Sequence, residues 1–244
     1  RFGSLVEVPG LADYYTAVYA LGNRQPLKLE KEEHMAYMQG TDKGFEPGGW
    51  LTRAQAAVIF ARLSKREDGT PLLDKQQEYQ TGFVDIDGQA WYTKAVGMME
   101  QYGIINGFQD GSFRPQDPVS RAQLIAMATR FASKIPEGKS PFPDVPDSFW
   151  AADAIAYAVQ QGWANGYPEG VFLPEHPVTR AEATKVINRL LEREPDMAYV
   201  LSETFTLPFK DVARTHWAYA EIAEAAVAHY YIREGETETW TGIQ

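Results

Sequence analysis

The chain has 244 residues, no cysteine and a formal net charge of −10 at pH 7. Its hydrophobic (44%) and aromatic (13%) fractions indicate a globular protein rather than a disordered one. The acidic balance opposes binding to a phosphate backbone, so nucleic acid is not an expected partner. No apolar stretch approaches the length of a membrane-spanning helix, so we expect no membrane insertion. Without cysteine, neither disulfides nor thiolate chemistry is available, which fits the cytosol or the exterior of a Gram-positive cell.

The sequence is organised by internal repetition. Residues 83–134 and 142–193 repeat the same order of residue types, and Trp91 and Trp150, for example, are separated by 59 residues like the other matched positions. The residue pattern of each unit indicates a helix, followed by a Gly/Pro-rich loop and a second helix. A unit of this size cannot bury its apolar face alone, so the copies must stack on one another.

Helical periodicity supports the second helix of each unit. Apolar residues fall at i, i+3, i+4 and i+7, as in Leu124, Met127, Ala128 and Phe131. The first helices carry narrower apolar stripes, and strand signals are weak throughout. We therefore predict a mostly α fold.

Two further copies are incomplete. Residues 1–66 resemble a degenerate first copy, with an insertion at about 22–33, in which Asp13 occupies the tryptophan position. Residues 209–232 begin a fourth copy, which ends in a tail, 233–244, without a second Arg-Ala-Glu element. The chain begins with Arg1 rather than Met and has no signal peptide, so we expect a processed or excised piece. All copies are expected to form one compact unit.

The second helix of each of the first three copies begins with Ser/Thr-Arg-Ala-Glu/Gln. This pattern predicts a capping box, which accounts for the hydroxyl and for the Glu or Gln. It does not account for the arginine, because a cation in the first turn opposes the helix dipole. The three arginines are Arg53, Arg121 and Arg180.

These arginines have two interpretations. Beside free helix N-terminal amides they would form a site for an anionic ligand, which we favour. Alternatively they pair with internal acids, and both arrangements could coexist. The internal candidates each follow a phenylalanine by two residues: Asp85, Asp144 and Asp211.

Tryptophan and glycine also recur at fixed positions. Trp91, Trp150 and Trp217 stand at the start of first helices, where they fit equally a core anchor or a stacking floor for sugar rings. Gly107 and Gly166 begin the loops. Their missing side chains would let a ligand approach the backbone, although a positive φ in a tight turn is the favoured interpretation.

No metal, cofactor or catalytic residue is expected. Asp110-Gly111 resembles half of a calcium loop, but the remaining ligands are missing. The four histidines show neither a Ser-His-Asp order nor the spacing of a metal site. The recurring acids come once per copy, whereas a glycosidase needs a pair of carboxylates.

In combination, Phe-x-Asp-Val, (His)-Trp-Ala, Gly-x-x-Asp-Gly-x-Phe-x-Pro and Val/Leu-Thr-Arg-Ala-Glu/Gln resemble the S-layer homology domain. The resemblance is strong in 83–193 and weak in 1–35 and 230–244. It implies tandem helix-loop-helix repeats assembled into a pseudo-threefold, three-pronged spindle around a central helix bundle. It further implies a non-catalytic module, covalently part of a larger cell-surface protein, that anchors this protein to an anionic, often pyruvylated, secondary cell wall polysaccharide.

The resemblance implies that the arginines grip the glycan and that the tryptophans line grooves between repeats. The expected glycan-binding residues are Arg53, Arg121, Arg180, Trp91, Trp150, Trp217, Asp85, Asp144, Asp211, Gly107 and Gly166. We further predict that each groove pairs the arginine of one copy with the tryptophan of the next, so that the half copy completes the third groove. Departures from the family pattern, such as Lys43 in place of the loop aspartate, put the first copy in doubt.

Two other functions remain open. One is a protein-interaction scaffold that keeps the fold without glycan binding, which the eroded first copy supports. The other is a carbohydrate-active enzyme, since carboxylates are plentiful.

Overall fold

The computed structural model describes residues 27–73, 78–132, 135, 137–235 and 237–244. The first half of the predicted degenerate copy, including Asp13, lies outside these residues. Helices predominate in the described part, as predicted, and named strands form two small two-stranded sheets. None of the described helices has the length and apolar character needed to cross a membrane.

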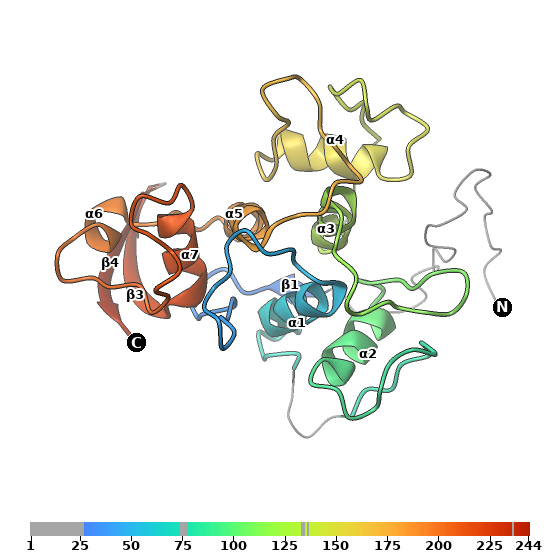
Figure 1. Cartoon of the computed structure of the whole chain (residues 1–244), viewed down its shortest axis with the longest axis horizontal. Helices are drawn as coiled ribbons and strands as arrows, with labels where there is room; N and C mark the ends of the chain where they lie inside the picture. The colour runs from blue at the N-terminus through green and yellow to red at the C-terminus, as the bar shows by residue number, and fades with distance from the viewer. Residues whose placement is uncertain (1–26, 74–77, 133–134, 136, 236) are drawn as a thin grey trace.

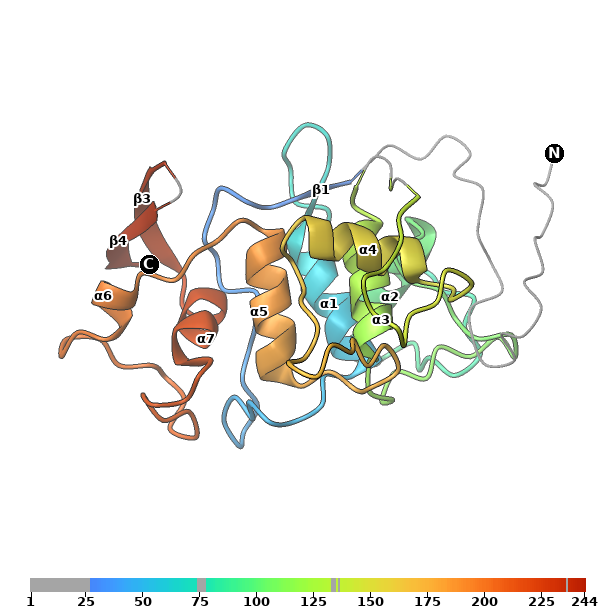
Figure 2. The ribbon, with the colours of Figure 1, turned by 90° about the horizontal axis from the view of Figure 1, so that it is seen from above.

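The helices that begin at the Ser/Thr-Arg-Ala motif lie at the centre of the molecule (Figure 1). They run side by side when the molecule is seen from above (Figure 2). Each begins with the predicted capping box, formed by Thr52, Ser120 or Thr179. The three central helices are α1 (Arg53–Leu63), α3 (Arg121–Thr129) and α5 (Arg180–Leu190).

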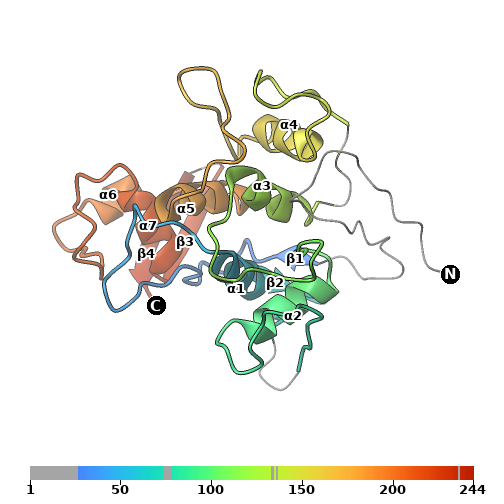
Figure 3. The ribbon, with the colours of Figure 1, turned by 45° about the vertical axis from the view of Figure 1, so that its right-hand side comes forward.

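The first helices of the later copies lie outside this row. They are α2 (Thr93–Gln101), α4 (Ala152–Gln160) and α7 (Tyr219–Ala226). Each packs against the central helix of the preceding copy: α2 on α1, α4 on α3 and α7 on α5 (Figures 1 and 3). The half copy therefore supplies the outer helix that covers α5.

A closed cycle of backbone hydrogen bonds joins the segments that precede the central helices. Leu51 N donates to Val178 O (3.0 Å), Val178 N donates to Val119 O (2.9 Å), and Val119 N donates to Leu51 O (2.8 Å). All three side chains are buried. Each of the three copies thus contacts the other two directly.

The loop of each of these copies inserts one phenylalanine that is fully buried: Phe45, Phe113 and Phe172. Phe45 and Phe113 belong to the main core, and Phe172 belongs to a smaller cluster around α4. The repeated loops are therefore packed parts of the fold.

The C-terminal segment, for which the sequence predicts only a tail, has regular structure. It forms an antiparallel hairpin of β3 (His229–Glu234) and β4 (Thr237–Ile243), with a bulge between Tyr230 and Tyr231. Because one apolar side chain, Trp240, carries most of the buried face of β4, its strand signal is weak. The remaining elements are a short sheet of β1 (Lys28–Leu29) with β2 (Ser64–Lys65), and α6 (Met197–Val200).

Candidate functional site

The motif arginines bind backbone carbonyl groups of the next copy. Arg53 donates from Nε to Phe113 O (2.6 Å) and from Nη2 to Asn106 O (2.9 Å). Because Nε and Nη2 form a rigid fork, the two bonds fix the loop relative to α1.

The same pair of bonds recurs in the other two copies. Arg121 reaches Phe172 O (2.8 Å) and Asn165 O (3.0 Å). Arg180 reaches back to the first copy, where Phe45 O (2.7 Å) and Gln39 O (2.6 Å) accept its hydrogen bonds. The arginines therefore close a second cycle through the three copies, with donors that run in the direction opposite to that of the backbone cycle. The acceptors of these hydrogen bonds are carbonyl groups rather than the predicted internal aspartates.

Each guanidinium group also lies over the phenylalanine whose carbonyl it binds. The distances from the guanidinium carbon to the ring centroid are 4.5 Å for Arg53, 4.6 Å for Arg121 and 4.8 Å for Arg180. Arg53 is 1% exposed and Arg180 5%. Burial lowers the pKa of Arg180, although the nearby Glu46 and Asp211 partly offset this. The arginine that the capping box left unexplained thus clamps one copy to the next.

The helix N-terminal amides are not free, contrary to the prediction of an anion site there. In α1, the N–H groups of Arg53 and Ala54 donate to Asp117 O and Pro115 O, each at 2.9 Å. Equivalent carbonyl groups cap α3 and α5. The loop of the next copy occupies the position that an anion would take.

The recurring aspartates hold the loops instead. Asp85 accepts the N–H groups of Phe113 and Arg114, both at 2.7 Å. Asp144 binds the equivalent pair in the third copy. Asp211, from the half copy, binds the N–H groups of Phe45 and Glu46 in the first copy.

The recurring glycines make room for a phenylalanine ring. A Cβ atom would lie 2.2 Å from the Phe83 ring at Gly107, and 2.2 Å from the Phe142 ring at Gly166. Neither glycine has a positive φ, so the favoured interpretation of a left-handed turn was wrong at both positions. The close approach is real, but the approaching group belongs to the protein.

The three repeated tryptophans are not equivalent in their surroundings. Trp91 is 64% exposed and Trp217 is 58% exposed. Trp150 is partly buried and packs against the small core around α4. Two of the three are therefore available to a ligand, and one contributes to the core.

One pocket, of about 230 Å³, combines Trp91 with two arginines. Its lining includes Gln39, Gln55, Arg62 and Arg180. Arg62 donates from Nη2 to Gln39 Oε1 at 2.8 Å, and burial lowers its pKa. Trp91 thus shares a pocket with Arg180, whereas the sequence had paired it with Arg53.

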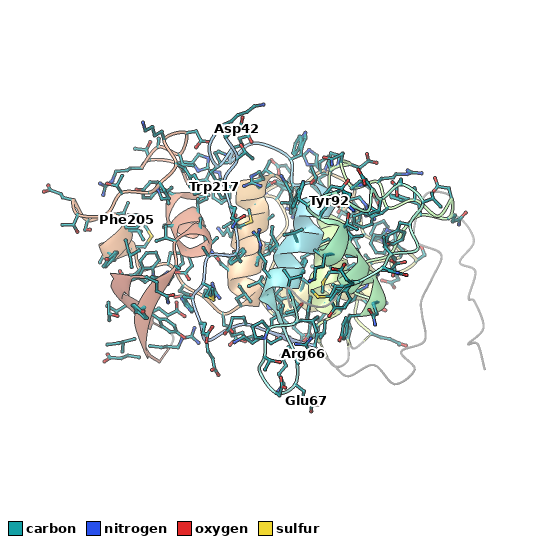
Figure 4. The ribbon with its side chains drawn as sticks, turned by 90° about the horizontal axis from the view of Figure 1, so that it is seen from below. Asp42, Arg66, Glu67, Tyr92, Phe205 and Trp217 are labelled. Atoms are coloured by element: carbon teal, nitrogen blue, oxygen red, sulfur yellow. The ribbon has the colours of Figure 1, made fainter. Side chains whose placement is uncertain are left out.

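A second pocket, of about 310 Å³, is lined by residues of α5 and α7 and by Trp217, which is labelled in Figure 4. Trp217 lines it with three arginines, Arg189, Arg193 and Arg214, of which Arg193 is 2% exposed and donates to the carbonyls of Met35 and Glu33. Lys185 Nζ lies a further 5.7 Å from the centroid of a Trp217 ring. Arg180 lines the pocket of Trp91 rather than this one.

The fold and these pockets define a class: a tandem helical-repeat module whose surface pockets place an indole ring beside cations. The sequence model of the S-layer homology domain family matches residues 82–125 and 141–184. The chain therefore carries two S-layer homology domains and belongs to a bacterial cell-surface protein.

Three relatives illustrate this placement. The chain is 32% identical over 206 residues to a cellulosome-anchoring protein of Acetivibrio thermocellus, a match that spans 82% of the chain and 44% of the relative. It is 31% identical over 223 residues to cell surface glycoprotein 1 of the same organism, covering 86% of the chain and 9% of the relative. It is 36% identical over 155 residues to an S-layer protein of Bacillus thuringiensis subsp. finitimus, covering 61% of the chain and 18% of the relative. The chain thus spans less than half the length of these relatives.

Proposed function

We propose that the chain is a non-catalytic module that anchors a larger surface protein by binding an anionic, pyruvylated secondary cell wall polysaccharide. The observation that carries this proposal is the shared composition of the two pockets. Each places an exposed indole ring, Trp91 or Trp217, beside guanidinium groups. An indole face can stack on a sugar ring, and a guanidinium group can bind a carboxylate through two parallel hydrogen bonds.

Charge supports an anionic ligand at these positions. The chain as a whole carries −10, yet three arginines gather around Trp217. From the first pocket we propose a groove rule. Each groove lies on one central helix and is completed by the tryptophan of the next copy and the motif arginine of the previous copy, as Trp91 and Arg180 do on α1. By this rule Arg53 belongs with Trp150, whereas the pocket of Trp217 departs from the rule, because it is lined by Arg189, Arg193 and Arg214 in place of Arg121. The remaining predicted residues, including the three aspartates and Gly107 and Gly166, would then shape the loops behind the grooves.

The cyclic contacts support the three-pronged spindle that we propose as the architecture. In it, the half copy 209–232 and the first copy together make one repeat, beside repeats 83–134 and 142–193. Two relatives carry enzyme names, an amylopullulanase and an exoglucanase, and the matches cover 8% and 14% of their lengths. This small share supports an anchoring segment separate from the catalytic parts of those proteins.

Binding to purified cell wall sacculi tests the proposal. The chain should co-sediment with intact sacculi and lose binding when the acid-labile polymer has been removed. Trp91→Ala and Trp217→Ala should each weaken binding about tenfold, since stacking of a ring on an aromatic side chain contributes on the order of 1 kcal/mol or more. Trp50→Ala is the matched control, because Trp50 is 46% exposed and lines neither pocket.

Two results would favour other functions. Binding that survives removal of the polymer would indicate a protein-interaction scaffold. Release of sugars from the sacculi by the purified chain would indicate an enzyme. Arginines 121 and 180 are poor test positions, because their loss would loosen the joints between copies.

A further inference from the structure

Three buried side chains outside the repeated motifs meet beside the C-terminal hairpin: His34, Glu224 and His229. Their side chains are 0% exposed. His34 Nδ1 lies 2.9 Å from His229 Nε2 and 3.0 Å from Glu224 Oε1. His229 Nε2 lies 3.4 Å from Glu224 Oε2. Sequence reasoning missed this cluster, because His34 is 195 residues from His229 in the chain.

The internal repetition shows that the acid at position 224 is a departure from the pattern. Glu224 occupies in α7 the position that Met98 occupies in α2 and Tyr157 in α4. A buried carboxylate costs free energy unless it is paired. Glu224 is fully buried and contacts both histidines, so its carboxylate needs partners inside the fold.

Hydrogen bonds among the described residues satisfy only one of the two oxygens of the Glu224 carboxylate. Oε2 accepts a hydrogen bond from Trp240 Nε1 at 3.2 Å. Oε1 has no hydrogen-bond partner among the described residues, although His34 Nδ1 is 3.0 Å away. Two polar atoms at this distance without hydrogen-bond alignment are expected where their lone pairs point to a common centre.

Neighbouring groups also fix the orientation of the two histidine rings. His229 Nδ1 lies 2.8 Å from Val227 O, and when it donates to that carbonyl its Nε2 presents a lone pair to the cluster. The ring of Tyr231 stacks on His34 at 3.8 Å, and the ring of Trp240 stacks on His229 at 3.6 Å. Both imidazole rings are therefore fixed before any ligand binds.

The distances suit a tetrahedral metal ion. For metal–nitrogen bonds of about 2.0–2.1 Å, two ligand atoms of a tetrahedral site are about 3.3 Å apart. Here the two nitrogens are 2.9 Å apart, and each lies near a different oxygen of Glu224, His34 Nδ1 at 3.0 Å from Oε1 and His229 Nε2 at 3.4 Å from Oε2, so the carboxylate presents both oxygens to the site. Two imidazole nitrogens and one carboxylate form a ligand set typical of Zn²⁺. Glu238 Oε2, 3.7 Å from His34 Nδ1, is the nearest candidate for a fourth ligand.

We propose that His34, Glu224 and His229 bind a Zn²⁺ ion that fastens the segment before the first loop to α7 and the C-terminal hairpin. A pocket of about 410 Å³, lined by both histidines together with Tyr230 and Tyr231, provides the entry path. The ion is structural in this proposal, because it joins three segments and sits away from both tryptophan pockets.

Metal content of the tag-free chain tests the site. After chelator treatment, incubation with ZnCl₂ and gel filtration, elemental analysis should find one zinc per chain. His34→Ala and His229→Ala should each reduce this content at least tenfold. His176→Ala should retain it, because His176 is exposed and remote from the cluster. At a hundredfold excess over the dissociation constant, zinc should raise the Tm of the unmodified chain by about 5–10 °C.

Two outcomes would overturn the proposal. One is an unmodified chain that retains no stoichiometric zinc; the cluster would then be held by a shared proton. The other is full zinc retention by both folded histidine variants. If circular dichroism shows that the variants do not fold, Co²⁺ added to the unmodified chain decides. Intense visible absorption of four-coordinate Co²⁺ supports the site, and its absence rejects it.

Discussion

Asp211 and Phe45 are 166 residues apart in the chain, and the Asp211 carboxylate accepts the backbone N–H of Phe45 at 2.9 Å. Asp85 makes the same bond to Phe113 within one copy, at 2.7 Å. The C-terminal half copy therefore supplies to the first copy the contacts that the second copy makes internally. A segment from near the end of the chain thereby closes the cycle at its beginning.

This closure predicts that Asp211→Asn destabilises the whole fold. An amide retains one acceptor oxygen, but its NH₂ group would face a backbone N–H. Leaving a donor unpaired in this way costs about 1–3 kcal/mol, which lowers the Tm by about 3–10 °C. Thermal unfolding followed by circular dichroism measures the change. Asp42→Asn is the control, because Asp42 lies in the loop that Asp211 binds but points outward from it (Figure 4). An equal loss of stability in both variants would contradict the closure.

The same carboxylate predicts a pH dependence. Burial raises the pKa of Asp211, but the N–H groups of Phe45 and Glu46 lower it more, so the net pKa lies below 3.8. A carboxylate whose pKa is lowered by folding stabilises the protein above pH 3.8, and this contribution disappears as the pH falls through the folded pKa. The difference in Tm between the unmodified chain and Asp211→Asn should therefore shrink below pH 3.8. A difference that is constant across the acidic range would argue against this role.

The sequence predicted the local structure well where one residue acts on its near neighbours. The capping boxes at Thr52, Ser120 and Thr179 are confirmed with both of their hydrogen bonds. The helices that follow begin at the predicted residues, because a cap and an apolar periodicity are both short-range signals.

Contacts between copies could not be predicted in the same way. The repeated motifs show that an arginine and a tryptophan recur in each copy. Which arginine meets which tryptophan depends on how the copies are arranged around the cycle, and in the structure Arg180 and Trp91 share a pocket. The role of Gly107 was missed for the same reason, since the ring of Phe83 comes from a distant part of the unit. Glu224 carried a signal that could have been read, because it interrupts an apolar repeat position.

Close packing of Phe83 on Gly107 predicts that Gly107→Ala is destabilising. The added Cβ would lie 2.2 Å from a ring carbon and 2.7 Å from Ser112 O, so the loop must shift. Overpacking of this kind costs about 1–3 kcal/mol. Chemical denaturation gives the free energy of unfolding. Gly48→Ala provides the comparison, because nothing lies within 4 Å of its Cβ position, and it should leave stability nearly unchanged.

The arginine clamp predicts that lysine cannot replace Arg53. Lysine keeps the charge but lacks the planar fork that reaches Phe113 O and Asn106 O together. We expect Arg53→Lys to lower the free energy of unfolding by about 1.5–3 kcal/mol, the range for hydrogen bonds to a charged group. Arg114→Lys should change it by less than about 1 kcal/mol, since Arg114 forms an exposed ion pair with Asp110. Equal stability of the two variants would show that the clamp contributes little.

The groove rule makes a prediction about coupling that rests on the proposed glycan binding. Arg62 and Trp91 line one pocket, whereas Trp217 lines another. The affinity losses of Arg62→Ala and Trp91→Ala should therefore combine non-additively, by about 0.5 kcal/mol or more, because both side chains would contact the same ligand. Losses from Arg62→Ala and Trp217→Ala should add within about 0.5 kcal/mol. Titration of the single and double variants with polymer fragments that span one groove measures both terms. Strong coupling of Arg62 to Trp217 instead would mean that the two pockets form one continuous site.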